Sequence, residues 1–415
     1  MQVVYERCCG LDIHKRSVVA CLIVPGSDGQ PTKQVKSFGT MTDDLLQLSD
    51  WLLHTRVTHV AMESTGVLWK PIYNLLEGSF ELLLVNPAHI KAVPGRKTDV
   101  RDCEWIADLL RHGLLAGSFV PDQEQRELRE LTRYRTQLIR ERASEVNRMH
   151  KTLEGANIKL SSVATDIMGV SGRQMLSALM EGQTDTELMA QLAKGRMREK
   201  IPQLQAALKG RFGPHQRFML AQQLAHIDFL DASIEELNRE IEERMRPFQE
   251  EVDLLMTIRG VGLRTAEVLI AEIGVDMERF PTSKHLASWA GMCPGNHESA
   301  GKRKSGKTRK GNVWLRTALV EAAQAAGRCK GSRDGYLSAQ YRRISRSGGP
   351  NKAAVAVGHS ILVIGYEMLK HRTPYNDLGA GYFDERDRQT KERRLIHGLE
   401  RLGYKVSLEP LPSAA

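Results

Sequence analysis

Residues 8–24 read CCGLDIHKRSVVACLIV, and this stretch decides the fold class of the first part of the chain. Two apolar, β-rich runs at 8–13 and 18–24 flank a short polar break, which predicts two neighbouring strands. Asp12 lies inside the first run, where a helix-capping role does not suit it. Because a carboxylate in an apolar strand is costly to bury without a compensating partner, Asp12 is the first candidate site residue.

The alternation of short apolar runs and helical patterns continues to residue 111 and predicts a mixed α/β domain. Three strands followed by helix, strand, helix, strand and helix is the element order of a ribonuclease-H-like fold. The predicted elements are strands 8–13, 18–24 and 34–38, helix 42–55, strand 58–62, helix 68–76, strand 80–85 and helix 100–111.

Three further acids join Asp12 as candidates for a metal site. Glu63 ends the apolar run 59–63, and Asp99 and Asp102 lie three apart at a predicted helix start, on one side of the turn. Nucleases that use two metal ions hold Mg²⁺ ions about 4 Å apart with such carboxylates. The four acids therefore predict Mg²⁺ ligation, with Mn²⁺ as an alternative. For Asp99 or Asp102, the alternative is an ordinary first-turn acid of a helix.

The positive charge of the chain is concentrated in one segment. The net charge is +9, whereas residues 301–352 hold fourteen Lys and Arg against two acids, a local charge of +12. Such a patch indicates phosphate-backbone binding, although a basic enzyme without nucleic acid remains an alternative. The candidate binding residues are Lys302, Arg303, Lys304, Lys307, Arg309, Lys310 and Arg316.

Ser299 precedes this patch in the stretch Glu298-Ser299-Ala300-Gly301. Neighbouring cations lower the cost of a serine alkoxide and stabilise a pentavalent phosphorus, so the pattern suggests phosphoryl chemistry. Taken alone, Ser299 also fits an ordinary loop serine.

The middle of the chain is helical. Segments 122–155 and 217–246 have helical periodicity, and Leu220, Ile227, Ile234 and Ile241 form a heptad seam in the second. An antiparallel hairpin within one subunit and a dimerising coiled coil explain the seam equally well. Residues 156–216 between them are poorly patterned and read as a helix-leaning insertion.

Residues 254–269 read as helix, glycine turn and helix, which resembles the helix-hairpin-helix of sequence-independent DNA binders. An ordinary glycine-containing helix turn is the alternative. The tail after residue 375 holds a basic helix around 386–401 and a predicted strand at 404–408.

The six cysteines contain no CxxC pair, which argues against zinc and redox motifs and fits a reducing compartment. The N-terminus lacks a signal-peptide layout. The apolar stretch 353–369 is too short and too polar for a membrane span and predicts a buried helix. A cytoplasmic protein is therefore expected.

Six motifs in order across residues 8–370 resemble the IS110 family of insertion-sequence transposases, the bridge-RNA-guided recombinases. They are Gly10-Leu11-Asp12-Ile13-His14-Lys15, Glu63-Ser64-Thr65-Gly66, Asn86-Pro87, Lys97-Thr98-Asp99-Val100-Arg101-Asp102, Ile258-Arg259-Gly260-Val261-Gly262 and Glu298-Ser299-Ala300-Gly301.

The resemblance implies a RuvC-like domain at 1–118 whose acid quartet is Asp12, Glu63, Asp99 and Asp102. It implies a coiled-coil region at 119–250 with the insertion at about 156–216, a mainly α transposase domain at 251–375 and an accessory tail at 376–415. The nucleophile maps to Ser299, with Ser305 as the fallback.

The resemblance also implies the partners. These are the DNA of the element ends and the target, a structured guide RNA, and further copies of the chain in a dimer or a dimer of dimers. The acids of one subunit would meet the serine of another. The expected location is the cytoplasm, at the nucleoid, without a membrane.

The leading hypothesis is a DNA recombinase that cleaves and rejoins strands through a phosphoserine link. One rival is a metal-dependent, structure-specific endonuclease that uses water, as a Holliday-junction resolvase does. The other is a nucleic-acid-binding structural protein with a degenerate nuclease fold.

Overall fold

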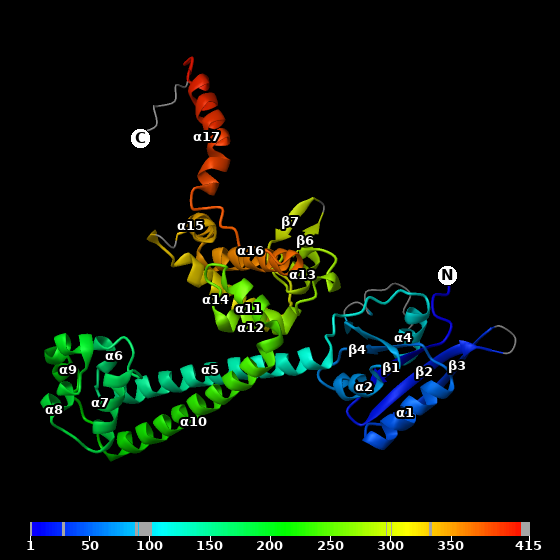
Figure 1. Ribbon diagram of the computed structural model, residues 1–415, viewed down its shortest axis with the longest axis horizontal. Helices are drawn as coiled ribbons and strands as arrows, with labels where there is room; N and C mark the ends of the chain where they lie inside the picture. The colour runs from blue at the N-terminus through cyan, green and yellow to red at the C-terminus, as the bar shows by residue number, and fades with distance from the viewer. Residues whose placement is uncertain are drawn as a thin grey trace. The chain divides into compact units, whose positions relative to one another are not determined.

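The computed structural model describes residues 2–26, 30–87, 90, 102–295, 297–299, 301–331 and 334–407. The chain divides into two compact units, Met1–Gln123 and Glu124–Ala415 (Figure 1). The first contains a mixed sheet with helices, and the second is mostly helical. The predicted change from α/β to α structure along the chain is therefore confirmed.

The first unit is built on a five-stranded sheet in the order β3-β2-β1-β4-β5. Strand β1 pairs antiparallel with β2 and parallel with β4, while β5 continues the parallel half. The predicted element order is the observed one. The elements are β1 (Cys8–Ile13), β2 (Ser17–Pro25), β3 (Pro31–Gly39), α1 (Thr42–His54), β4 (His59–Glu63), α2 (Trp69–Leu76), β5 (Glu81–Val85) and α4 (Asp102–Arg111).

The two faces of this sheet bury different residues, because side chains alternate along each strand. Cys9 and Leu11 of β1 pack into a core with α1 and α2. Cys8 lies in the opposite core with Ile106 and Leu110 of α4. The β1 positions that share the face of Cys8 are Gly10 and Asp12, so Asp12 belongs to the α4 side of the sheet.

Gly10 is the point of closest approach between the sheet and α4. A Cβ added there would overlap backbone atoms of Cys103 and Ala107, and the Ala107 Cα would lie 3.0 Å away. The absent side chain lets the helix pack directly on β1, and Asp102 begins that helix. This contact sets how near the start of α4 comes to the end of β1.

Gly10→Ala should therefore destabilise the protein by about 1–3 kcal/mol, since backbone atoms cannot move aside as a flexible side chain can. Denaturant unfolding followed by circular dichroism measures the change. Gly155→Ala is the matched control, because a Cβ at Gly155 meets nothing within 4 Å. Equal stability of the two variants would contradict the close-packing explanation.

Two long helices, α5 (Gln123–Gly155) and α10 (Pro214–Met245), dominate the start of the second unit. They run antiparallel, because Arg244 pairs with Glu127 whereas Gln223 bonds to Thr152. The seam residues Leu220, Ile227, Ile234 and Ile241 are all buried within the single chain. Of the two explanations for the seam, the intrachain helical hairpin is the one that this structure contains.

The insertion folds as a small helical cluster, here called the head, of residues 156–213. Its core also takes in Met149 and Leu153 of α5 and Leu220 of α10, so it closes the end of the helix pair (Figure 1). It comprises α6 (Leu160–Val163), α7 (Val170–Met180), α8 (Thr186–Gln191), the 3₁₀ helix η1 (Gly195–Lys200) and α9 (Ile201–Ala207).

The C-terminal region is a cluster of helices around α16. In the described part of the chain, α16 is the one helix long and apolar enough to cross a membrane, but 56% of its apolar window is buried. It packs on α14 and α15, so the predicted buried helix is confirmed. The region comprises α11 (Gln249–Met256), α12 (Leu263–Ile273), α13 (Ser283–Trp289), α14 (Val313–Gly327), α15 (Tyr336–Gly348) and α16 (Pro350–His371).

The tail begins with α17 (Tyr382–Arg401), which includes the predicted basic helix. The strand predicted at 404–408 is wrong for residues 404–407, which form no strand pairing. Alternating apolar residues stabilise a strand only when another strand supplies its hydrogen bonds, and the helical surroundings offer none.

Candidate functional site

Asp12 and Glu63 occupy matching positions on neighbouring strands. The parallel register of β1 and β4 pairs Gly10 with Ala61 and Leu11 with Met62. The next residues along the same register are Asp12 and Glu63, at the carboxyl ends of the two strands. Parallel strands present their carboxyl ends at one edge of a sheet, so the two acids share both an edge and a face.

Each of these acids has one local partner and remains accessible. The imidazole Nε2 of His14 lies 3.2 Å from Asp12 Oδ2, and the Asp12 side chain is 28% exposed. The hydroxyl of Thr65 donates to Glu63 Oε1 at 3.0 Å. His14 and Thr65 stand two residues after their acids, in the polar turns where the strands end. The carboxylates are therefore not buried in the core, and each one meets its partner through a single carboxylate oxygen.

Asp102 is the first residue of α4 and is exposed. Its helix lies on the sheet face of Asp12 and Glu63 through the Gly10 contact. Asp99 lies outside the described residues. Sequence reasoning placed Asp12 inside the first strand, Glu63 at the end of a later strand and Asp102 near a helix start, and the structure has each acid on the predicted element.

The carboxylate oxygens of these acids are the ligand type that Mg²⁺ and Mn²⁺ take. Within the part of the chain that is described, no three His, Cys, Asp or Glu side chains lie close enough to hold a metal ion. The donor chemistry therefore fits a hard divalent cation, while the three described acids alone do not enclose one.

Thiols share this sheet face but are core residues. Burial raises the pKa of Cys8 and of Cys21 to about 12. Cys103 of α4 is also buried. Because a thiol with such a pKa stays protonated at neutral pH, Cys8 and Cys21 do not compete with the carboxylates for a metal or act as nucleophiles.

Ser299 lies at the tip of a β-hairpin in the second unit. Strands β6 (His297–Ser299) and β7 (Lys302–Ser305) pair antiparallel, with Ser299 opposite Lys302. Gly301, directly before β7, adopts a φ of 72°, a conformation that glycine favours. The Ser299 side chain lies outside the described part of the structure, and so do those of Arg303 and Lys304.

The other predicted cations surround this hairpin. The residues Lys302, Lys307, Arg309 and Lys310 are exposed, and none has an acidic partner among the described residues. Arg316 differs from them, because it is half-buried and donates to the Thr308 hydroxyl at 2.8 Å. Arg316 therefore holds the loop that carries the other cations.

The base of the hairpin loop is fixed by backbone contacts. The Gly295 amide donates to the Lys307 carbonyl at 2.8 Å. At Gly291, with φ at 68°, an added Cβ would lie 2.7 Å from the Gly311 amide nitrogen. The chain thus enters and leaves the loop at a single tight crossing, where a larger side chain does not fit.

Glu272 joins this crossing to α5. Its side chain is fully buried, and both carboxylate oxygens accept from Arg133 at 2.7 Å. The amide of Asn312 donates to Glu272 Oε2 at 2.6 Å. The side-chain oxygen of Asn312 accepts from the amides of Trp314 and Leu315 and so caps α14. One carboxylate on α12 therefore joins α5, the end of the loop and the start of α14.

A second buried pair supports the same junction. Arg135 Nη2 lies 2.6 Å from Glu267 Oε2, and both side chains are almost completely buried. Trp314 lies beneath the guanidinium groups of Arg133 and Arg140, at 6.0 and 5.5 Å from its ring centroid. Trp314 therefore packs against α5.

The glycine turn between α11 and α12 has a structural explanation at Gly260. Its φ is 93°, and a Cβ there would lie 2.8 Å from the Ala326 amide nitrogen of α14. Arg259 pairs with Asp377 at 3.0 Å and donates to the Asp334 carbonyl. Gly262 is open and begins α12. Close packing thus accounts for Gly260, whereas a phosphate contact at Gly262 stays a prediction.

Sequence reasoning missed Glu267, Glu272 and Asn312. A signal was present, because the two acids interrupt the apolar helix Leu263–Ile273 and α5 carries arginines at 129, 133 and 135. An acid in an apolar helical run indicates a buried partner, but the sequence does not say which basic residue supplies it.

Replacing Glu272 with Ala should destabilise the second unit by about 3–5 kcal/mol, because it leaves the Arg133 guanidinium without its buried partner. Denaturant unfolding measures the loss. Arg244→Ala is the control, since its pairs with Glu240 and Glu127 are about half exposed, and a loss below about 1 kcal/mol is expected there. Similar losses of unfolding free energy in the two variants would contradict the view that Glu272 holds these elements together.

Comparison with known proteins identifies the class. A family profile for the IS110 DEDD transposases, described as "Transposase", matches residues 9–158. A second, described as "Transposase IS116/IS110/IS902 family", matches residues 252–338. Together the two matches cover more than half of the chain, and the head lies between them.

Relatives of known name agree. A probable family 20 transposase of Pseudomonas aeruginosa is 25% identical over 331 residues, which cover 79% of this chain and 89% of that protein. The transposase for insertion sequence element IS1111A of Coxiella burnetii is 24% identical over 70% of this chain and 72% of its own. The pilin gene-inverting protein of Moraxella lacunata is 22% identical over 88% of this chain and 97% of its own.

These matches define the protein as a DNA transposase. More particularly, the chain belongs to the IS110 family of insertion-sequence transposases.

Proposed function

We propose that this transposase cleaves and rejoins the DNA of an insertion sequence by transesterification through Ser299, with a metal-binding acid quartet in a RuvC-like, ribonuclease-H-like domain. The observation that carries the proposal is the matched placement of Asp12 and Glu63 on adjacent parallel strands under α4. Supporting it are the strand order of the sheet and the family membership.

The acid quartet of the proposal comprises Asp12, Glu63, Asp99 and Asp102, which would hold Mg²⁺ or Mn²⁺. Such ions, when bound, neutralise charge at the attacking and leaving oxygens of a phosphodiester. His14 pairs with Asp12, and the Thr65 hydroxyl donates to Glu63, so each carboxylate has one partner that would help to position it. Four carboxylates without a cation would repel one another, which favours metal binding at this edge.

Each step of the proposed reaction forms one phosphorus–oxygen bond and breaks another, so the number of phosphodiester links does not change. The Ser299 hydroxyl gives up its proton and its oxygen bonds to phosphorus. A phosphorus–oxygen bond to a deoxyribose breaks, and the released hydroxyl takes up a proton. Attack by the hydroxyl of another strand reverses these steps and frees the serine. Ser299 stands opposite Lys302 at the hairpin tip, where a cation favours the alkoxide.

The exposed cations of the hairpin loop would hold the DNA backbone at the element ends and target. The exposed side chains of Lys302, Lys307, Arg309 and Lys310 lack acidic partners within the described residues, so they are available for phosphates. Arg303 and Lys304 complete this group by sequence. Arg316 contributes by holding the loop through Thr308.

The family resemblance extends the proposal to assembly and targeting. The acids and the serine belong to different units of the chain, so a dimer or a dimer of dimers would let one subunit supply the acids and another the serine. A structured guide RNA would specify the target by base pairing. The protein would act in the cytoplasm, on nucleoid DNA.

A second candidate function is a structure-specific endonuclease in which water replaces Ser299. The accessible carboxylates at the sheet edge are equally compatible with this function, because a metal held there could assist attack by water or by the Ser299 hydroxyl. Covalency separates the two, since only the serine mechanism leaves protein attached to a DNA end.

Ser299→Ala should lower strand exchange by at least about a thousandfold and abolish the covalent protein–DNA adduct, because the nucleophile is lost. The measurement is denaturing gel electrophoresis of labelled element-end DNA after incubation with the protein and its RNA. Ser305→Ala is the control, because its hydroxyl accepts from the Lys307 amide at 3.1 Å in the same hairpin. An adduct that persists in Ser299→Ala and disappears in Ser305→Ala would transfer the nucleophilic role to Ser305.

Asp12→Asn and Glu63→Gln should each reduce metal-dependent strand cleavage by at least about a thousandfold, since they remove ligand charge while keeping side-chain shape. Mn²⁺ binding by calorimetry should weaken in parallel, and the unfolding midpoint should stay close to wild type. Asp50→Asn on α1 is the matched control, because it is exposed and lies on the other side of the sheet. Wild-type Mn²⁺ affinity in Asp12→Asn would exclude the quartet as the metal site.

A further inference from the structure

The head has a strong local charge that the transposase chemistry does not use. Residues 192–217 contain seven Lys and Arg and a single acid, Glu199, which gives a net charge of +6. Four cations lie in or just before η1, ahead of α9, two lie in the turn after α9, and Arg217 lies in the first turn of α10, next to the head. Seven helical residues span about 10 Å, so the two groups can contact separate phosphates of one strand.

Most of this charge is not neutralised within the protein. Arg196, Lys209 and Arg211 are exposed and have no acidic partner among the described residues. Lys200 Nζ donates only to the Val163 carbonyl at 3.1 Å, and Arg198 Nε to the Ala193 carbonyl. These bonds to carbonyls position the side chains and leave their charge uncompensated.

A cavity of about 340 Å³ adjoins the second group of cations. Its walls carry Lys209, Arg217, Thr184 and Thr186, and its lining contains no acid. An apolar floor is formed by Leu179, Met189, Leu208 and Phe212.

The guanidinium of Arg217 lies against Gly182 in the lining of this cavity. Gly182 has a φ of 86°, and a Cβ there would overlap the guanidinium in its present position. The turn thus combines an apolar floor, hydroxyl groups and two cations, which is the combination that an unstacked nucleotide requires.

We propose that the head binds a single-stranded segment of nucleic acid, with its phosphates on the cations at the ends of α9 and an unstacked base in this cavity. Duplex DNA keeps its bases in the stack and cannot fill such a cavity, whereas a single strand or a loop can. The proposal does not depend on Ser299 or the acid quartet.

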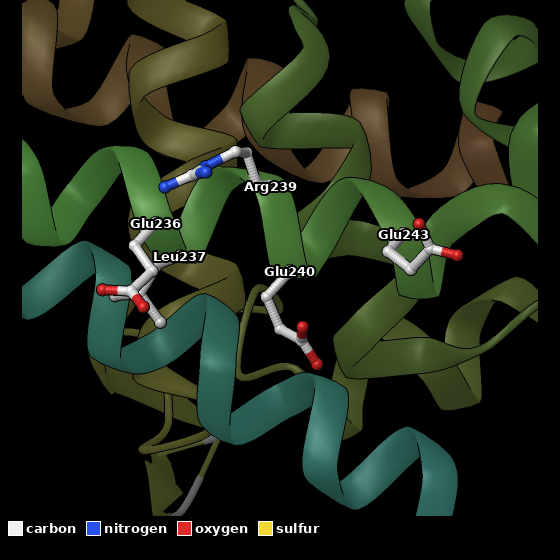
Figure 2. A pocket seen from close by; sticks show the side chains of 5 residues that line it. All are labelled: Glu236, Leu237, Arg239, Glu240 and Glu243. Atoms are coloured by element: carbon white, nitrogen blue, oxygen red, sulfur yellow. The ribbon is translucent and has the colours of Figure 1, made fainter.

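The excess positive charge of the head does not extend to the other end of the helix pair. On α10 at the other end of the helix pair, Glu236, Glu240 and Glu243 lie within two helical turns, and Arg239 points away from Glu240 (Figure 2). In that view Glu240 points toward α5, and it accepts from Arg244, which also bonds to Glu127 of α5. This acidic surface provides a control in which equal charge is removed from a place that should repel phosphates.

The test is fluorescence anisotropy on the full-length protein with a 20-nucleotide DNA strand, an RNA strand of the same sequence and the corresponding DNA duplex. The head variant is Lys209→Ala/Arg211→Ala, and the control is Arg239→Ala/Arg246→Ala. The head variant should bind both single strands about tenfold more weakly. The slope of log affinity against log salt should fall by about 1.4, at roughly 0.7 per lost phosphate contact. Comparison of the two strands tells whether the 2′-hydroxyl contributes.

Unchanged single-strand affinity in the head variant would overturn the proposal. An equal loss of single-strand affinity in the control would also overturn it, because the effect would then come from net charge. An equal loss of duplex affinity in the head variant would show that the cavity does not select unstacked bases, which also contradicts the proposal. Thermal unfolding of the head variant should be unaltered, because the side chains of Lys209 and Arg211 are exposed and have no ion-pair partner within the described structure. Since binding is measured without turnover, failure of the serine chemistry would not change this result.

Discussion

The buried carboxylate of Glu272 is the interaction on which the second unit depends. It binds Arg133 of α5 and Asn312, and Asn312 in turn caps α14. A carboxylate without exposure to water needs every one of these donors, because a missing partner leaves a charge uncompensated. Helix α5, the end of the hairpin loop, α12 and α14 thereby meet at this carboxylate. The loop that carries the β6–β7 hairpin ends at Asn312, so the end of that loop is held at this point.

The first unit depends on a constraint of a different kind, the missing side chain of Gly10. Where Glu272 joins elements through charge, Gly10 joins them by letting backbone approach backbone. In both units a candidate catalytic residue lies beside such a junction: Asp12 two residues beyond Gly10, and Ser299 in the loop between Gly291 and Gly311. In the proposed reaction this support would matter, because small displacements of reacting atoms lower the rate of phosphoryl transfer strongly.

Much of this could be read from the chain itself. The elements of the first unit were predicted in order, because alternating apolar runs bounded by turn residues give a strong local signal. The long helices and the buried α16 followed from periodicity in the same way. The strand predicted at 404–408 is wrong for the described residues 404–407, because a strand needs a pairing partner that local sequence does not reveal. The head was visible only as a gap in the pattern, because its helices are short and its core uses residues from both long helices.

The sequence by itself determined which chemistry-bearing residues exist and which elements carry them: acids at strand ends and a helix start, a serine before a basic segment, and a seam on α10. Local periodicity and motif spacing are properties of neighbouring residues, so they need no tertiary information. Only the tertiary structure decided which residues meet. It placed Asp12 and Glu63 in one register, closed the seam within one chain, and paired Glu272 with an arginine 139 positions away. Such contacts join residues far apart in the chain, and their partners are selected by packing and by the need to compensate buried charge.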